Sequence, residues 1–411
     1  MKRIAKQAAA FLSACCVFVL GAGIYTDREV PDAYYVIEGQ ENPLESGFLI
    51  QTSSSREKVS PASVSGASAT YRVSLFGLIP VKDVTVNVIE EKMVLPGGMP
   101  FGIKMFTEGV VVVGLSEIDG ADGKTKNPAA SAGMAVGDVI LQIDGTPVNA
   151  NEQVAELVKK SKGKKMTFRV RRKNVSLSIE VTPVKGTDGG YKAGIWVRDS
   201  SAGIGTITFI DPLKGTFGGL GHPVCDADTG QILPLSSGQI VAAEIFGVNK
   251  STPGTAGELR GSFSPLPGSM GTLFHNGETG VYGRLTDPGS ISGTAVPVAV
   301  KQQIREGEAT VLATLNGTIP KEYTIRIETI NLADPGQSKN MIIRVTDPAL
   351  LEQAGGIVQG MSGSPILQNG RLVGAVTHVF VDDPTKGYAI FAENMLETAQ
   401  SVAKEQLKEA S

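Results

Sequence analysis

Hydrophobic and polar residues alternate over many short stretches of the chain, which is the pattern of half-buried β-strands. Tyr71 to Ile89 is rich in β-branched residues and predicts two short strands, and similar alternation recurs over 139–143, 166–170 and 175–181. An apolar run from Leu372 to Phe380 predicts a more deeply buried strand. Apolar residues at helical spacing predict helices over about 151–161 and over Glu393–Glu409. The pattern predicts a mostly β protein.

The N-terminus has the character of an export signal or a membrane anchor. Basic residues precede a charge-free run from Gln7 to Thr26, whose apolar part, Ala8 to Ile24, holds 17 residues. That length lies between a secretory signal core and a membrane-spanning helix. We expect a signal or anchor segment over 1–26, and the basic flank places the rest of the chain outside the cytoplasm.

A polar region follows the apolar run. Residues 27–70 are expected to form an extracytoplasmic linker, with a Ser/Ala-rich stretch from Thr52 to Thr70 that has almost no large apolar side chains. Exposed backbone of this kind enters a protease cleft easily, so cleavage is expected between about residues 40 and 75. Residues 71–94 form the strand segment that leads into the next domain.

Composition narrows the chemistry that is available. The chain has 411 residues, enough for two or three domains, and a net charge of −3, which argues against a nucleic-acid partner. Its three cysteines, two of them inside the apolar run, exclude a disulfide framework and a cysteine-rich zinc site. No metal or organic cofactor is implied. Nine basic residues in the fifteen from Lys159 to Lys173 form either a solvated surface or a patch facing anionic lipid.

Residues 133–145, GMAVGDVILQIDG, resemble the core signature of a PDZ domain, and the resemblance spans about 95–184. Gly137-Asp138 suits a turn, and Asp144-Gly145 suits a tight hairpin. The resemblance implies a loop of backbone amides that receives a peptide. We expect Phe101, Gly102 and Ile103 to form that loop. Pro100 lacks an amide hydrogen, so binding of an internal peptide segment is as plausible as capture of a C-terminus.

The strongest catalytic signal is GMSGSP at 360–365, which resembles the G-D-S-G-G-P of chymotrypsin-like serine proteases. A nucleophilic serine needs a tight turn whose own amides face the developing oxyanion, and glycines permit that turn. We therefore expect Ser362 to be the nucleophile and the amides of Gly360 and Ser362 to form the oxyanion hole. Ser364 is less suited because Pro365 follows it at once.

A serine nucleophile needs a base, and the chain has only three histidines. His222 follows a run with three glycines in four residues, which implies close backbone approach, and it precedes Ser362 by 140 residues. That distance suits a base from one barrel and a nucleophile from the next. The residues alone do not decide which carboxylate orients this histidine. The candidates are Asp347, Asp226, Asp228 and Asp287.

His378 lies on the predicted strand that follows the nucleophile turn. In chymotrypsin-like enzymes this strand lines the pocket for the residue before the cut. We expect His378 to donate a hydrogen bond to the substrate side chain in that pocket. One alternative is a buried strand histidine that is satisfied by backbone, and a second is that His378 itself is the base.

Four motifs occur together in a specific order and resemble the stage IV sporulation protein B peptidase family. They are LFGLIPVKDVTV at 75–86, the PDZ signature, GLGH at 219–222 and GIVQGMSGSP at 356–365. The resemblance covers about 70–400. It places the family's essential His, Asp and Ser on His222, Asp347 and Ser362.

This resemblance implies a mostly β fold: an N-terminal membrane anchor, a PDZ domain at 95–184, and a chymotrypsin-like double-barrel peptidase at 190–411 with a C-terminal helix. It implies a serine endopeptidase exported across the forespore membrane, which cleaves itself and is released into the intermembrane space. Its protein substrate is then the regulatory subunit of an intramembrane metalloprotease complex, whose release activates a late sigma factor. The alternative is a non-catalytic PDZ scaffold in a membrane complex.

Overall fold

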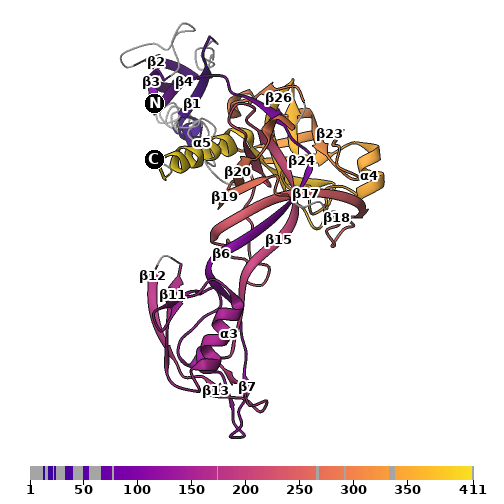
Figure 1. Cartoon of the computed structure of the whole chain (residues 1–411). Helices are drawn as coiled ribbons and strands as arrows, with labels where there is room; N and C mark the ends of the chain where they lie inside the picture. The colour runs from indigo at the N-terminus through magenta and orange to yellow at the C-terminus, as the bar shows by residue number, and fades with distance from the viewer. Residues whose placement is uncertain are drawn as a thin grey trace.

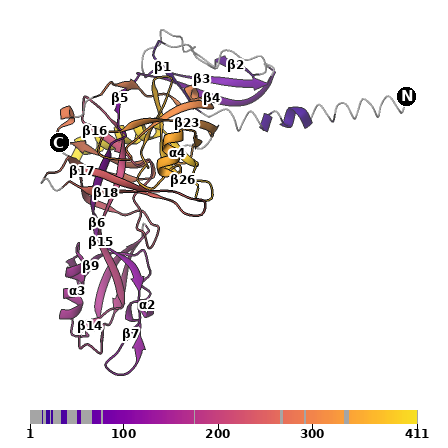
Figure 2. The same cartoon turned by 90° about the vertical axis from the view of Figure 1, so that its right-hand side faces the viewer.

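The computed structural model shows a mostly β chain with a globular body and a smaller unit that projects from it (Figures 1 and 2). It describes residues 13, 17–21, 23–24, 33–39, 50–54, 66–75, 78–173, 175–264, 268–290, 293–332 and 338–409. Most of the expected anchor lies outside these ranges. Among the residues described, no helix has both the length and the apolar character needed to cross a membrane.

The first ordered unit is a four-stranded sheet in the order β1-β4-β3-β2. Its strands are β1 (Ala33–Ile37), β2 (Ile50–Ser54), β3 (Ser68–Leu75) and β4 (Ile79–Ile89). The last two confirm the two strands predicted over Tyr71–Ile89. The linker expected over Thr52–Thr70 is wrong at both ends, because Thr52 pairs with Val73 and Thr70 pairs with Thr85. Residues 55–65 lie outside the described part.

The projecting unit contains the predicted PDZ elements. They are β9 (Val139–Ile143), β10 (Thr146–Pro147), β11 (Met166–Arg172), β12 (Val175–Val181), α2 (Pro128–Ser131) and α3 (Asn151–Lys160). Asp144 and Gly145 both have positive φ and form the tight hairpin that the sequence predicted. Ile140, Phe168 and Val170 are fully buried in the core of this unit, which therefore has an apolar centre of its own.

Six strands of the main body pair in a closed ring and form the first barrel. In ring order they are β6 (Pro100–Leu115), β17 (Leu235–Asn249), β19 (Gly271–Gly277), β20 (Gly280–Leu285), β16 (Thr216–Gly219) and β15 (Ile195–Ile210). The pairing of β6 with both β17 and β15 closes the ring. Phe101 and Phe217 meet edge to face inside it, with ring centroids 5.9 Å apart.

The second barrel is closed in the order β22-β23-β24-β27-β26-β25. Its strands are β22 (Gly307–Ala313), β23 (Lys321–Ile330), β24 (Met341–Val345), β25 (Pro365–Gln368), β26 (Arg371–Val379) and β27 (Lys386–Phe391). Helix α4 (Pro348–Ala354) leads into the nucleophile turn, and α5 (Ala392–Glu409) confirms the predicted C-terminal helix. Strand β26 confirms the strand predicted over Leu372–Phe380.

Shorter elements complete the chain. They are β5 (Met93–Pro96), β7 (Ile118–Asp119), β8 (Thr125–Lys126), β13 (Val184–Lys185), β14 (Tyr191–Lys192), β18 (Glu258–Phe263), β21 (Val296–Pro297) and the 3-10 helices at Pro288–Ser290 and Lys301–Gln303.

Two long strands, β6 and β15, run from the projecting unit into the first barrel (Figure 1). They pair from Ile195–Leu115 at the PDZ end to Thr206–Pro100 at the barrel end. The PDZ unit is therefore an insertion between two neighbouring strands of the first barrel. This corrects the expectation that the peptidase barrels begin only after the PDZ domain, at residue 190.

The expected peptide-binding loop is also corrected. Phe101, Gly102 and Ile103 lie in β6, where each pairs with residues of both β15 and β17. Phe101 and Ile103 are buried in the first barrel, and a Cβ at Gly102 would collide with Phe263. Their backbone groups are paired with the neighbouring barrel strands, so these three residues cannot form an open loop for a peptide.

Candidate active site

A cleft of about 470 Å³ is lined by residues of both barrels and by the turns that carry the predicted catalytic groups. Leu220 and His222 come from the segment after β16, Gly360 and Ser362 come from the turn after α4, and His378 comes from β26. The structure thus brings together the predicted base, nucleophile and pocket histidine, although they are far apart in the sequence.

The nucleophile turn depends on glycine and on a threonine of the first barrel. Gly360 and Gly363 both have φ of +94°, a conformation that disfavours side chains. Thr206 of β15 binds the turn at two points: its hydroxyl donates to the Gly360 carbonyl (2.8 Å) and its amide donates to the Ser362 carbonyl (3.1 Å). The first barrel therefore fixes the turn of the second.

The backbone amides proposed for the oxyanion hole are free for that role. Within the described part of the chain, the amides of Gly360 and Ser362 donate to no carbonyl or side chain, whereas the amide of Gly363 donates to the Val376 carbonyl at 2.8 Å. Free amides beside a nucleophile can stabilise a negative oxygen. Their role as the oxyanion hole stays a prediction.

His222 is held by its own neighbouring backbone. Its Nδ1 lies 2.8 Å from the Pro223 carbonyl, and because a carbonyl only accepts, Nδ1 carries the hydrogen. The neutral imidazole then has an unprotonated Nε2, which is the nitrogen that a general base needs. Burial lowers the pKa of His222, although the bond to Pro223 works in the opposite direction.

The hydroxyl of Ser362 donates to the Thr377 carbonyl at 2.8 Å. It must turn away from this carbonyl before its proton can pass to His222. The structure therefore places the predicted nucleophile and the predicted base in one cleft, and a backbone carbonyl holds each of them.

His378 faces His222 across the cleft, with ring centroids 4.9 Å apart and ring planes inclined by 39°. Among the described residues nothing bonds its buried Nδ1, so the alternative of a histidine satisfied by backbone is wrong at this nitrogen. Burial, followed by the nearby His222 and Lys339, lowers the pKa of His378 to about 4. A neutral His378 at the cleft can donate to a substrate, and its pocket role stays a prediction.

The structure corrects the assignment of Asp347 as the acid that orients His222. Asp347 is the N-cap of α4, and its Oδ1 accepts from the amides of Ala349 (2.9 Å) and Leu350 (3.1 Å). Its Oδ2 accepts from the amide of Thr324 (3.2 Å). Both oxygens thus serve backbone amides, and Asp347 is not among the residues that line the cleft. It supports the helix that leads into the nucleophile turn.

A conservative and a truncating substitution separate these two roles. Asp347→Ala is expected to lower stability by about 1 kcal/mol, the usual cost of a lost N-cap, seen as a lower melting temperature. Asp347→Asn keeps one capping oxygen, so Ser362 is expected to react with an active-site probe within about tenfold of the wild-type rate. A loss of the order of 10⁴ in Asp347→Asn would return this residue to the triad.

The three other acids are engaged elsewhere. Asp226 and Asp228 both pair with Arg198, and Asp287 accepts from the amide of Gly289. The group that the structure shows at His222 Nδ1 is the Pro223 carbonyl. Sequence reasoning missed this carbonyl and the two threonines, Thr206 and Thr377, because backbone oxygens and barrel threonines carry no motif.

A second groove of about 590 Å³ lies in the PDZ unit between α3 and the start of β15. Val154 and Val158 of α3 form one wall, and Ile195 to Val197 form the other. The side chain of Trp196 is 65% exposed. The sequence predicted a peptide-binding loop at Phe101–Ile103, whereas the strand that lines this groove together with α3 is β15.

The pH dependence of Ser362 reactivity follows from the state of His222. Because burial holds the pKa of His222 below its ordinary value of 6.5, the neutral base persists to a lower pH. The rate of Ser362 labelling is expected to rise with pH along one ionisation whose midpoint lies below 6.5, and to be level above pH 7. The labelling rate is measured at a series of pH values by quenching the reaction at fixed times. A midpoint above pH 7 would contradict His222 as the buried base.

A serine on a glycine turn and a neutral imidazole that line the same cleft are the groups that a serine peptidase site requires. A PDZ domain profile matches residues 97–182. The profile described as SpoIVB peptidase S55 matches residues 189–396, which is just over half of the chain. The chain belongs to this SpoIVB peptidase family and is a serine peptidase.

Two curated proteins share shorter stretches with the chain. The membrane metalloprotease ARASP of Arabidopsis thaliana is 35% identical over 77 residues, which is 18% of this chain and 17% of that protein. The zinc metalloprotease candidate LL2128 of Lactococcus lactis is 31% identical over 121 residues, 29% of this chain and 26% of that protein. The chain thus spans about a quarter or less of either relative.

The solved structures that the comparison found include two proteases. The Rv3671c protease of M. tuberculosis in its active form is 15% identical, with 49% of this chain and 74% of that chain covered and a TM-score of 0.28. The HtrA-type protease AlgW with a decapeptide is 13% identical, with 50% and 55% covered and a TM-score of 0.30.

Proposed function

We propose that this chain is a signalling serine endopeptidase in which Ser362 attacks the scissile carbonyl and His222 takes its proton. The observation that carries the proposal is the single cleft in which Ser362, Gly360, His222 and His378 meet. The free amides of Gly360 and Ser362 support a place for the oxyanion beside the nucleophile. Neutral His222, with Nδ1 donating to Pro223, supports a base at Nε2.

The chemistry is acyl transfer in two halves. The Ser362 oxygen bonds to the carbonyl carbon while its proton moves to Nε2 of His222, and that proton then leaves with the amine as the peptide bond breaks. Water then attacks the acyl-enzyme, and His222 takes a proton from it and returns one to Ser362. The Pro223 carbonyl keeps the imidazole in the required tautomer throughout.

The setting proposed for this activity is sporulation. Membership of the SpoIVB peptidase family supports it, as do the basic flank and apolar run at the N-terminus. The chain is then exported across the forespore membrane and anchored there, and it is released into the intermembrane space after self-cleavage. The substrate is the regulatory subunit of an intramembrane metalloprotease complex. The partial likeness to two membrane or zinc metalloproteases is compatible with that setting.

Self-cleavage is testable on the purified full chain in detergent. Trimming is expected between about residues 40 and 75, because this interval contains the Ser/Ala-rich stretch from Thr52 to Thr70, which has almost no large apolar side chains. N-terminal sequencing of the shortened form would locate the cut. Ser362→Ala made alone should stay full length, and identical trimming of that variant would contradict self-cleavage.

The regulatory substrate is tested by co-incubation. The purified enzyme is expected to cut the extracytoplasmic part of the regulatory subunit, whereas Ser362→Ala is expected to leave it intact. A scaffold without catalysis would bind the subunit and leave it uncut with either protein. Mass spectrometry of the products would also show whether the residue before the cut carries a hydrogen-bond acceptor, as the pocket role of His378 requires.

A further inference from the structure

The loop that follows His222 is a compact structure with its own internal bonds. Val224 and Leu233 are joined across it by a backbone bond of 3.1 Å, and Asp226 and Gln231 by one of 2.8 Å. Asp226 also accepts from the amide of Gly230 at 2.8 Å. The segment from Val224 to Leu233 therefore moves as a unit, and His222 is two residues from its start.

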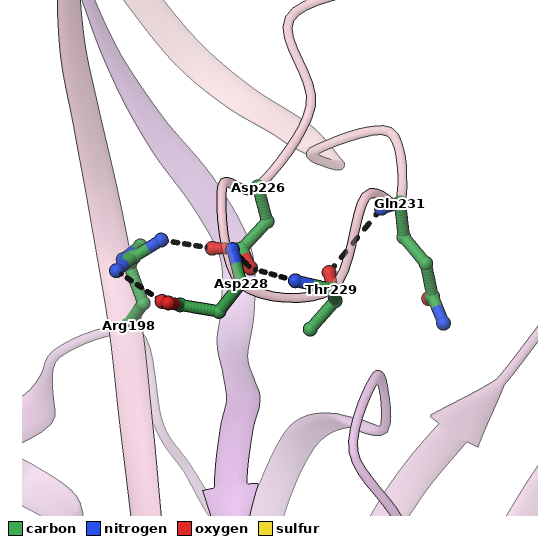
Figure 3. A network of polar contacts seen from close by, with 5 residues as sticks. All are labelled: Arg198, Asp226, Asp228, Thr229 and Gln231. Carbon is green, nitrogen blue, oxygen red and sulfur yellow. Dashed lines mark hydrogen bonds and ion pairs between the residues drawn. The ribbon is translucent and has the colours of Figure 1, made fainter.

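A buried carboxylate is the centre of this loop (Figure 3). Asp226 is only 2% exposed, and its Oδ1 accepts from the amides of Thr229 (2.9 Å) and Asp228 (3.1 Å). Its Oδ2 accepts from the guanidinium of Arg198. Burial would raise the pKa of Asp226, but the bonds from Thr229 and the charge of Arg198 outweigh it and lower that pKa. Asp226 is thus a charged, fully engaged group.

Arg198 forms hydrogen bonds to the loop through two nitrogens of its guanidinium. One donates to Asp226 and the other donates to Oδ2 of Asp228 at 2.7 Å. Figure 3 shows the two carboxylates converging on this single side chain, which comes from a strand outside the loop. A planar guanidinium with two bonds fixes direction as well as distance, which a single charge does not.

The strand that carries Arg198 belongs to the PDZ side of the molecule. Arg198 pairs with Val111 of β6, at the PDZ end of the two long strands. The next residue, Asp199, accepts from the amide of Asn151, the first residue of α3, at 2.9 Å. Consecutive residues therefore hold the PDZ helix and the His222 loop. Gln231 in the same loop lies against Gly137 of the PDZ turn.

The loop is also held on the barrel side, by hydrogen bonds to Asn276. Asn276 of β19 accepts from the amide of Val224 (2.8 Å) and donates to the Val224 carbonyl (2.9 Å). The segment after His222 is thus held from the barrel by Asn276 and from the PDZ side by Arg198.

We propose that Arg198 is a positioning residue for His222, which fixes the loop after the catalytic histidine to the strand that leaves the PDZ domain. This inference rests on the proposed role of His222 as the base. The reach of His222 to Ser362 then depends on the PDZ unit, although no PDZ residue contacts the reacting atoms. A displacement of about 1 Å at a catalytic group is enough to cost about 10²-fold in rate.

The test compares two arginines that each pair with a buried aspartate but lie in different parts of the molecule. Arg172 pairs with Asp138, which is fully buried, but both lie inside the PDZ unit, and Arg172 and Arg198 are similarly exposed, at 38% and 33%. Arg198→Ala and Arg172→Ala each leave a buried carboxylate without its cation. The measurement is fluorophosphonate labelling of Ser362, with the limiting rate separated from probe binding, and circular dichroism to verify folding.

Arg198→Ala is expected to lower the limiting rate about 10- to 100-fold with little change in probe binding, whereas Arg172→Ala stays within about twofold. Arg198→Lys keeps the charge but loses the pair of guanidinium nitrogens, so its limiting labelling rate should lie between those of Arg198→Ala and the wild type. Equal labelling by Arg198→Ala and Arg172→Ala would overturn the proposal. If Arg198→Ala does not fold, Arg198→Lys decides, because it keeps the charge and loses the two-nitrogen geometry of the guanidinium: a wild-type rate in that variant overturns the proposal and a lower limiting rate supports it.

His222→Ala separates this inference from the proposed function. If His222→Ala is still labelled at the wild-type rate, the proposed role of His222 is wrong, whatever Arg198 does. If His222→Ala is not labelled and Arg198→Ala is labelled at the wild-type rate, only the positioning role of Arg198 is wrong.

Discussion

Replacing Ser362 with alanine is expected to lower peptide cleavage by about 10⁴- to 10⁶-fold and to abolish fluorophosphonate labelling. The physical reason is that the acyl bond forms on the Ser362 oxygen, and Ser364, the other serine of this turn, is fully buried. His222→Ala is expected to lose nearly as much, because the serine keeps its proton at neutral pH without a base. The double variant should be no worse than either single one.

Two controls make this result specific. Ser364→Ala removes a buried hydroxyl that has no partner among the described residues, so it should leave the labelling rate within a few fold of wild type. Circular dichroism should show the same fold for every variant. Labelling that persists in Ser362→Ala and disappears in Ser364→Ala would move the nucleophile by two residues.

Gly363→Ala is expected to have the second-largest effect, a loss of about 2–4 kcal/mol in stability together with most of the activity. Gly363 has φ of +94°, and a Cβ there would lie against the Thr206 carbonyl and 2.5 Å from the Leu220 nitrogen. Those contacts are backbone atoms of the first barrel and cannot rotate away. The turn would have to shift as a whole, and Ser362 would move with it.

Gly370→Ala is the matched control for this prediction. Gly370 also has a positive φ, +73°, but a Cβ there would meet nothing within 4 Å. Gly370→Ala should therefore lower the free energy of unfolding by only about 1–2 kcal/mol, which is the cost of placing alanine in the left-handed conformation. Equal losses of stability for the two variants in denaturant unfolding would show that backbone conformation, and not contact between the barrels, dominates at Gly363.

Much of the local structure could be predicted from the sequence. The hairpin at Asp144–Gly145, the strands on either side of it and the C-terminal helix all follow from alternation, turn residues and helical spacing. The sequence also predicts Ser362 and His222 as catalytic residues, because each lies beside glycines that a close-packed catalytic turn requires. The structure places both in one cleft, and their roles stay predictions. In all of these cases the signal is local and the tertiary structure does not override it.

Two errors have physical causes. The loop at Phe101–Ile103 was predicted from its position within the PDZ resemblance, and no local feature of these three residues shows that they pair with barrel strands on both sides. Asp347 did carry a signal: an aspartate directly before Pro348 is typical of a helix N-cap followed by proline at the first helical position. Family resemblance favoured a catalytic role there, and the local chemistry favoured the cap.

The shared strands β6 and β15 set the order in which the molecule can assemble. Their barrel ends, Pro100 and Thr206, are separated in the chain by the whole PDZ unit, and closing such a loop in an unfolded chain is slow. Once the PDZ core has formed, Leu115 and Ile195 are already adjacent, so the ladder can extend from that pair toward the barrel one residue at a time. The PDZ unit then acts as a nucleus for the peptidase: the first barrel becomes quick to close only when the inserted domain has folded.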